Sequence, residues 1–571
     1  MVSARLPFFV LCLGIFGITI CCCYTLSNKH KSLPRQKSTL AYCAPRDDDG
    51  GALFKGNEIS FVDTEESTIP YSSLQSIGIS LPSSMKPTII PQNAVSNYNL
   101  FCNRELNLDQ IEAIGFDMDW TLAQYNEDFD LLAYNGAKEK LVSWFNYPKE
   151  VLELKYNKNL CRRGCIIDVK RGNVIKLDRH KYVHAAEHGL SALSSAERKS
   201  IYKNIYLGSK ESWYKGKGFV NIDTPFSLVD ACLYMQLVDM CDNIETDVKI
   251  DRTYEEIYSD MRRCIDRCHK DGVIKLKVAE DPSKYITYDP NIFPMLDTFR
   301  KSGRKVFLLT NSLYDYTEVV MNYLEGRKSG DKKDQEWMKY FDVVIVGGNK
   351  PFFLVDEKSL ALFRVNADNQ RLENIDKFPD KNEINEFLAK GKLFQGGNAP
   401  MLHKLLQLKH PDRVLYIGDH VYADILRSKR SLGWRTCLII PELVEEIVAH
   451  RKASGILSDL MQLRKDQFLL ENELQSAIEG DSTGNVSQLT LELTELKLTI
   501  RRKLEVYNKI YHPRYGPLFK TGFKESRFAK QIKDYACIYT SRTSNLDIVS
   551  TSRILRPVRD FLPHDHFIEG L

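Results

Sequence analysis

Two aspartates that directly follow an apolar segment are the strongest chemical signal in this chain of 571 residues. Ile111–Phe116 predicts a buried strand, and Asp117 and Asp119 stand immediately after it, two residues apart. One such carboxylate can attack phosphorus as a nucleophile, while the other donates a proton to the leaving oxygen and later accepts one from water. The alternative is a simple aspartate turn after a strand, so the pair needs support from elsewhere in the chain.

Three later apolar segments also end in residues that suit phosphoryl chemistry. Thr310 and Asn311 offer hydrogen bonds to a phosphoryl group, and Lys350 offers a positive charge that stabilises it in the transition state. Asp419 and Asp424 add carboxylates that can bind a metal, and Mg²⁺ suits a site built from oxygen ligands. The four segments therefore indicate a phosphoryl-transfer site with Mg²⁺ as its cofactor.

These segments resemble the haloacid-dehalogenase-like phosphohydrolases, and more closely the cytosolic purine 5′-nucleotidase and the related 5′-nucleotidase domain-containing proteins. The resemblance extends from about Leu106 to Pro563. It is carried by the four segments above and by Gly418–Leu426, Gly433–Thr436, Pro441–Leu443, Gly516–Phe519, Phe528-Ala529 and Leu562–His564.

The resemblance implies a role for each residue of the site. Asp117 would be the nucleophile, Asp119 the general acid and base, and Lys350 the group that stabilises the phosphoryl oxygens. Thr310 and Asn311 would bind the phosphate. Mg²⁺ would be held by the Asp117 side chain, the Asp119 backbone carbonyl and Asp419, with Asp424 nearby.

The long interval between Asp119 and Thr310 predicts a cap inserted over the site, and the resemblance implies that this cap binds the substrate. Phe226 would stack on the base, beside Ser227. A second stretch resembles the nucleotide-contacting helix of the purine enzyme, which implies further contacts from Arg262, Asp266, His269 and Lys275. Alternatively, Arg262, Asp266 and His269 form a solvated helical face with a local ion pair, because their spacing also suits that structure.

The elements that must position these residues point to an α/β fold. Short apolar segments alternate with helical patterns, which predicts a parallel α/β sheet. The resemblance implies that this sheet is the Rossmann-like haloacid-dehalogenase core, and we expect a large inserted cap and a C-terminal helical hairpin in addition. Besides Ile111–Phe116, the expected strands are Lys305–Leu309, Phe341–Val346, Val414–Ile417 and Trp434–Ile440.

We expect six regions along the chain. They are a membrane anchor or targeting segment (1–28), a largely disordered linker (29–105), the phosphatase core (106–125 and 286–456), the cap (126–285), the hairpin (457–511) and a C-terminal segment packed on the core (512–571). Leucines at a spacing of three and four residues predict the hairpin, which is either a structural arm or an oligomer contact. A homo-oligomer is therefore possible.

The N-terminal segment contains an uncharged run of 23 residues, Leu6–Asn28. Such a run is long enough to cross a bilayer, and four basic residues follow it within the next nine positions (Lys29, Lys31, Arg35 and Lys37). By the positive-inside rule we expect a membrane anchor with a cytoplasmic body. A mitochondrial presequence and entry into the secretory pathway are the alternatives.

The charge distribution separates this end from the rest of the chain. Residues 1–46 hold six basic and no acidic residues, which leaves 73 basic against 75 acidic in the remainder. A body with this balance and no basic stripe predicts no nucleic-acid binding.

The sequence thus predicts a Mg²⁺-dependent 5′-nucleotidase that hydrolyses nucleoside 5′-monophosphates, with purines as the expected bases, through an aspartyl-phosphate. The alternatives are a phosphatase of another small phosphate ester and a membrane-anchored, non-catalytic scaffold.

Overall fold

The computed structural model describes residues 100–203, 218–243, 249–327, 335–355, 361–480 and 483–557. The expected anchor lies outside these residues. Among the helices within them, none has the length and the apolar composition that crossing a membrane requires.

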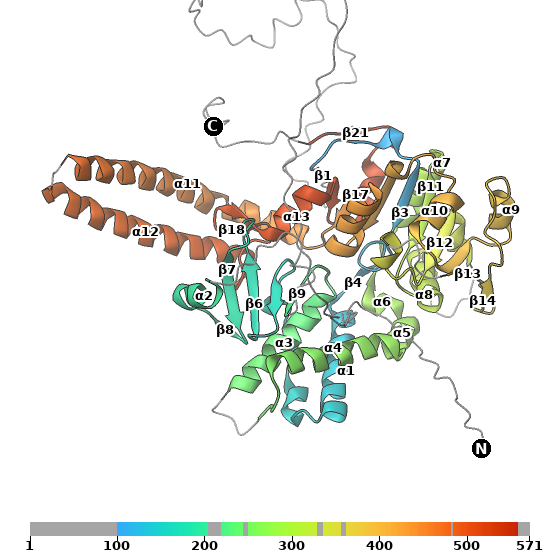
Figure 1. The fold of residues 1–571 in the computed structure, drawn as a ribbon, viewed down its shortest axis with the longest axis horizontal. Helices are drawn as coiled ribbons and strands as arrows, with labels where there is room; N and C mark the ends of the chain where they lie inside the picture. Colours follow the sequence, from blue (N-terminus) through green and yellow to red (C-terminus); the bar gives the residue numbers. More distant parts are fainter. Residues whose placement is uncertain are drawn as a thin grey trace, which may run out of the picture. The chain divides into compact units, whose positions relative to one another are not determined.

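A ten-stranded mixed sheet forms the core (Figure 1). Its central strands are parallel, in the order β20, β17, β16, β3, β11, β12 and β15, and antiparallel strands complete both edges. In sheet order the strands are β1 (Leu100–Cys102), β20 (Ile538–Thr540), β17 (Arg435–Ile439), β16 (Val414–Gly418), β3 (Ala113–Phe116), β11 (Lys305–Leu309), β12 (Val343–Val346), β15 (Leu393–Gly396), β13 (Leu362–Val365) and β14 (Leu372–Asn374).

All five strands expected from the sequence are present, and they are neighbours in this sheet. Their side chains are buried on both faces, which explains why they appear in the sequence as continuous apolar runs of β-branched and aromatic residues. The α/β fold class is confirmed.

Helices flank the sheet and connect its strands. The core helices are α7 (Ile292–Lys301), α8 (Tyr314–Leu324), α9 (Ile384–Ala389), α10 (Ala399–Leu405) and α13 (Arg527–Tyr535), with π-helical turns at Val421–Leu426 and Ser428–Leu432. Two two-stranded pairings join distant segments: β2 (Leu106–Asn107) with β21 (Ile554–Leu555), and β4 (Gln124–Tyr125) with β10 (Ile286–Thr287). A third, β18 (Lys520–Thr521) with β19 (Lys524–Glu525), is a local hairpin.

The insertion between β4 and β10 has a sheet and helices of its own. The sheet is antiparallel, in the order β8 (Ser191–Ala192), β7 (Val183–His188), β6 (Asn173–Leu177), β5 (Ile166–Asp168) and β9 (Phe219–Asn221). The helices are α1 (Glu127–Phe145), α2 (Ser195–Tyr202), α3 (Ser227–Asp242), α4 (Tyr254–Lys270), α5 (Val273–Glu280) and α6 (Pro282–Tyr285).

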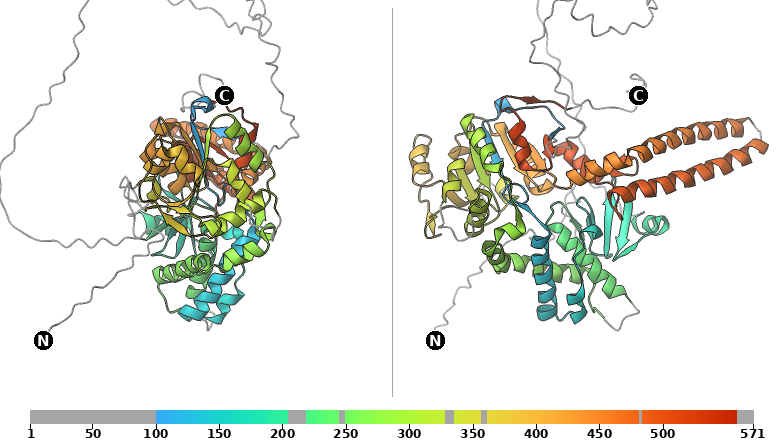
Figure 2. Two further views of the ribbon diagram at one scale, coloured as in Figure 1. Left: turned by 90° about the vertical axis from the view of Figure 1, so that its right-hand side faces the viewer. Right: turned by 180° about the vertical axis from the view of Figure 1, so that it is seen from behind.

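Two long helices, α11 (Leu443–Glu479) and α12 (Thr483–Tyr511), run side by side as a hairpin (Figures 1 and 2). Their contact is lined by the expected apolar positions, among them Leu460 and Ile500. Helix α11 begins 14 residues before the expected start at residue 457. Its first turns contact the core and the cap, so they lack the regular leucine spacing of the free hairpin.

The expected linker also ends earlier than residue 105. Leu100–Cys102 forms the edge strand β1, which pairs with β20 from the C-terminal segment. A strand of three residues gives too short a pattern to be recognised in a sequence, and its partner lies more than 400 positions away.

Candidate active site

The carboxyl ends of the central strands bring the predicted catalytic residues together. Asp117 follows β3, which lies between β16 and β11 in the sheet. The backbone N–H of Asp117 donates to the carbonyl of Ile417 at 2.9 Å, and that of Thr310 donates to Ile345 at 3.0 Å. These two hydrogen bonds extend β3 and β11 by one residue each. They fix the backbone of Asp117 and Thr310, and with it the positions of their side chains.

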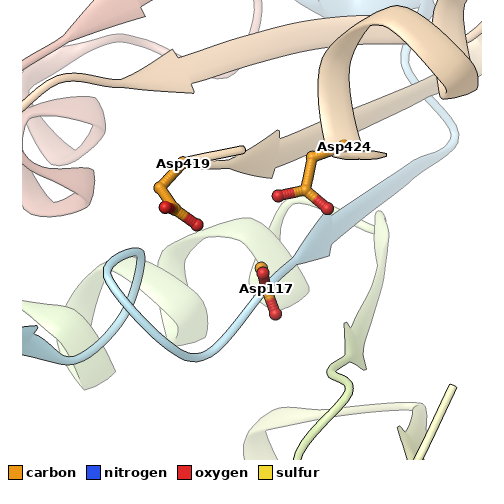
Figure 3. A group of neighbouring side chains, drawn as sticks. All are labelled: Asp117, Asp419 and Asp424. Atoms are coloured by element: carbon orange, nitrogen blue, oxygen red, sulfur yellow. The ribbon is translucent and has the colours of Figure 1, made fainter. Parts of the chain in front are cut away.

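Three aspartates from two of these strand ends form a compact cluster (Figure 3). Carboxylate oxygens of Asp117, Asp419 and Asp424 lie within 4.8 Å of one another, and the residues are only 8%, 3% and 0% exposed. Gly418 permits this approach, because a Cβ there would lie 2.4 Å from a carboxylate oxygen of Asp424. With this spacing, the three carboxylates could bind one metal ion together.

Lys350 inserts its ammonium group among these carboxylates. Its Nζ lies 2.8 Å from Asp117 and 2.9 Å from Asp424, and it donates to the Tyr416 hydroxyl at 2.9 Å. Asn311 holds the lysine backbone in place, accepting from the Lys350 N–H at 2.6 Å and donating to the Lys350 carbonyl at 3.2 Å. The Thr310 hydroxyl accepts from the backbone N–H of Ser312 at 3.1 Å. Both residues predicted to bind phosphate therefore lie at the site, and both also shape its loops.

Burial dominates the electrostatics of the cluster. Burial alone would lower the pKa of Lys350, but the carboxylates of Asp117 and Asp424 raise it well above its ordinary value, so the ammonium stays charged. Burial raises the pKa of Asp117 well above its usual range, Lys350 opposes this, and Asp424 and Asp419 add to it. Burial and the two neighbouring carboxylates therefore oppose ionisation of Asp117, and a further positive charge at the cluster would favour its charged form.

The carboxylate of Asp119 is bound by hydroxyl groups and is not one of the three clustered carboxylates. It accepts from the Tyr125 hydroxyl at 2.6 Å and from the Ser312 hydroxyl at 2.7 Å, and Tyr125 in turn lies 3.0 Å from the hydroxyl of Tyr316. Burial raises the pKa of Asp119, although the hydrogen bonds from Tyr125 and Ser312 lower it. A raised pKa suits a group that must donate a proton.

Aromatic rings from the core and the cap meet beside Asp119. Phe226, the predicted base-stacking residue, lies about 6 Å, centroid to centroid, from the rings of Trp120, Tyr125, Phe129 and His269. It remains partly exposed. His269 is half-buried, and its desolvation lowers its pKa to about 4, with Arg262 contributing in the same direction. A neutral imidazole at pH 7 offers one donor and one acceptor.

The other residues predicted to bind the substrate form ion pairs or hydrogen bonds with other residues of the protein. Arg262 on α4 forms ion pairs with both Asp230 on α3 and Asp266 one turn further along α4. Lys275 lies 3.6 Å from Asp315. Ser227 begins α3, and its N–H donates to the carbonyl of Thr224 at 3.1 Å.

Besides Tyr416, which contacts Lys350, four residues at the site were missed by sequence reasoning. Tyr125 and Tyr316 support Asp119, as described above. From the cap, the Thr224 hydroxyl donates to the Asp419 carboxylate at 2.7 Å, and Arg163 donates to the Asp419 backbone carbonyl at 3.1 Å. Thr224 could have been found, since it lies two residues before Phe226 in the stretch already singled out. The other three carry no sequence signal.

The residues present fit a divalent cation. Three carboxylates form a buried donor set that consists of oxygen atoms alone, which matches the preference of Mg²⁺ for hard oxygen ligands.

Sheet order and site together define a haloacid-dehalogenase-like phosphatase, a phosphoric monoester hydrolase. More specifically, the chain belongs to the 5′ nucleotidase family, whose model matches residues 100–567. A 5′-nucleotidase domain-containing protein of Dictyostelium discoideum is 29% identical over 487 residues, which cover 84% of this chain and 76% of that protein.

Several solved structures resemble parts of the chain. CbbY from Rhodobacter sphaeroides, solved in complex with phosphate, has 16% identity and a TM-score of 0.22, and the match covers 58% of this chain and 86% of that one. A predicted phosphoglycolate phosphatase from Haemophilus somnus has 12% identity and a TM-score of 0.22, covering 58% and 85%. With TM-scores of this size, the assignment rests on the sheet order, the site and the family match.

Proposed function

We propose that this protein is a Mg²⁺-dependent 5′-nucleotidase that hydrolyses nucleoside 5′-monophosphates through an aspartyl-phosphate, with purines as the preferred bases. The observation that carries the proposal is the contact of the Lys350 ammonium with Asp117 inside the three-aspartate cluster. The proposed nucleophile, a positive charge and two further carboxylates thus lie together beyond the carboxyl ends of the central strands, which supports the proposal.

In the first step, a carboxylate oxygen of Asp117 attacks the phosphorus of the 5′-phosphate. The bond between phosphorus and the 5′-oxygen breaks, and Asp119 gives its proton to that oxygen, which leaves as the nucleoside hydroxyl. Lys350 stabilises the negative charge that spreads over the phosphoryl oxygens.

In the second step, water attacks the phosphorus of the aspartyl-phosphate. The water proton passes to Asp119, the bond between phosphorus and Asp117 breaks, and inorganic phosphate leaves. Both aspartates return to their starting states. Tyr125 and Ser312 orient Asp119 for both proton transfers, since their hydroxyls hold both of its carboxylate oxygens.

Asp117, Asp419 and Asp424 would hold Mg²⁺, together with the backbone carbonyl of Asp119. When bound, the cation would neutralise the excess negative charge and polarise the phosphoryl group toward attack.

Base recognition is proposed for the aromatic group beside Asp119. The partly exposed ring of Phe226 would stack on the base, and the neutral His269 would supply a donor or an acceptor to its edge. The larger ring system of a purine would gain more from this stacking than a pyrimidine.

Phosphate release from a panel of nucleoside monophosphates, with and without Mg²⁺, tests the proposal. The expected result is Mg²⁺-dependent hydrolysis that is faster for purine than for pyrimidine nucleotides. Asp117→Asn should lower kcat by about 10⁴-fold or more, because the nucleophile is lost. Equal release by the wild type and by Asp117→Asn would exclude the aspartyl-phosphate mechanism, and a pyrimidine preference would exclude the purine assignment.

The location of the protein is a separate proposal. The run Leu6–Asn28 and the basic residues after it support a membrane anchor with the body in the cytoplasm. Fractionation of cells that express the chain with and without residues 1–28 tests this. Recovery of the intact chain in mitochondria would favour the presequence instead.

A further inference from the structure

The cap contacts Asp419 through Arg163, a residue that the proposed mechanism does not use. Arg163 precedes β5, and its side chain is fully buried, at 0% exposed. Its guanidinium donates to the backbone carbonyl of Asp419 at 3.1 Å and to that of Ile439 at 3.4 Å. One cap side chain thus holds the main chain after β16 and the end of the neighbouring strand β17.

The position of this guanidinium is itself fixed by other contacts. It forms an ion pair with Glu442 at 2.6 Å, and Glu442 stands immediately before α11. It also lies over the ring of Phe528, 5.4 Å from its centroid. The next residue, Gly164, has a φ of +86°, and a Cβ there would lie 2.6 Å from Phe528. The backbone approach that delivers Arg163 therefore requires glycine at position 164.

We propose that Arg163 is a positioning residue for the Mg²⁺ site, acting through the backbone of Asp419. The inference rests on the proposed Mg²⁺-dependent function. Thr224 binds the carboxylate of Asp419 and Arg163 binds its carbonyl, so the cap orients both polar groups of one metal-binding residue.

The energetic reason is that metal affinity depends on ligand placement to within a few tenths of an ångström. Loss of the Arg163 hydrogen bond would leave a buried carbonyl without its charged donor and would free the Asp419 backbone to rotate. The Asp419 carboxylate would then leave the close arrangement with Asp117 and Asp424. Changes to groups that orient metal ligands typically weaken metal binding about 10-fold to 100-fold.

The neighbouring residue provides a matched control. Arg162 is also buried and also pairs with a glutamate of α11, Glu446, at 2.7 Å. Its other guanidinium nitrogen donates to the carbonyl of Gly516 at 2.6 Å. Arg162→Lys and Arg163→Lys therefore disturb the same contact between the cap and α11, but only Arg163→Lys removes a bond to Asp419.

Calorimetric titration of the full chain with Mg²⁺ alone, in the absence of nucleotide, tests the inference. Arg163→Lys should raise the Kd for Mg²⁺ by about 10-fold or more, while Arg162→Lys should leave it within about twofold of the wild-type value. The rise in Tm on adding Mg²⁺ should shrink in parallel for Arg163→Lys only. Tm without Mg²⁺ reports the general loss of packing in both variants.

An unchanged Kd for Arg163→Lys, or an equal rise in both variants, would overturn the inference while leaving the proposed function intact. Failure of the wild type to bind Mg²⁺ would instead remove the metal-dependent function, and this inference with it. If Arg163→Lys does not fold, Glu442→Gln carries the test. It weakens the support of Arg163 and should raise the Kd in the same direction by less, and an unchanged value would count against the role of Arg163.

Discussion

The active site and the α11–α12 hairpin both contain lysine–aspartate pairs, but the two pairs occupy very different surroundings. Lys350 and Asp117 have side chains only 2% and 11% exposed, whereas Lys503 and Asp459 of the hairpin are 41% and 55% exposed. Water screens the hairpin pair and can replace either partner. At the active site the pair is shielded from water, so each charged group is stabilised by its protein partners alone.

This difference shows that the same ion pair has different consequences according to its burial. A buried pair is weak evidence for stability, since removing both charges from water is expensive. Its presence at the ends of the central strands is better explained by the proposed chemistry, in which both charged groups take part. The hairpin pairs, in contrast, mainly keep a long helical surface soluble.

The largest expected effect comes from removing the buried cation. Lys350→Met should lower the free energy of unfolding by about 3–5 kcal/mol, because three carboxylates would remain close together without a positive charge. Lys503→Met on the hairpin should change it by less than about 1 kcal/mol. Denaturant unfolding of both variants without added metal measures the two changes in the free energy of unfolding. Equal decreases would contradict the proposed difference between the buried and the exposed pair.

A smaller effect should appear as a pH dependence of stability. Burial lowers the pKa of His269 to about 4, below the value of about 6.5 for an unfolded chain. As pH falls from 6.5 toward 4, the unfolded chain takes up the proton first, so the native state loses stability. By linkage His269 should contribute about 3 kcal/mol to this loss.

Chemical unfolding at a series of pH values, compared between the wild type and His269→Gln, isolates this contribution. The half-buried His403 and the buried His512, whose pKa values desolvation also lowers, remain in both proteins and serve as the internal control. Parallel stability curves for the two proteins between pH 4 and pH 6.5 would contradict the lowered pKa of His269.

The smallest effect is expected from shortening the hairpin. A short Gly–Ser loop joining Lys465 to Ile500 would remove the outer part of both helices but keep the first turns of α11, which bind the cap. The kcat/KM for the preferred nucleotide should change by less than about twofold, since distant and independently packed regions contribute additively. A large loss of activity would show that the hairpin is coupled to the site.

Much of this molecule could be predicted from its sequence because the signals are local. Each predicted strand is an apolar run of four to seven residues, and each of the four chemical segments begins where such a run ends. Parallel strands place their carboxyl ends at one edge of the sheet, so Asp117, Thr310, Lys350 and Asp419 had to converge. Regular leucine spacing likewise revealed the hairpin.

Contacts between distant segments were decided only by the tertiary structure. Arg163 reaches Asp419 across 256 positions of the chain, and Tyr125 meets Tyr316 across 191. A buried arginine before a cap strand has the same local appearance as a solvated one. Its role depends on burial and on partners that only the folded chain supplies.

The sequence by itself therefore determined the class of chemistry and the sheet that supports it, because strand patterns and strand-end residues are properties of short segments. The tertiary structure decided which groups hold the reagents in place. That choice rests on the geometry of cap, core and α11 around Asp419, where the free energy of each polar group depends on whether a partner reaches it.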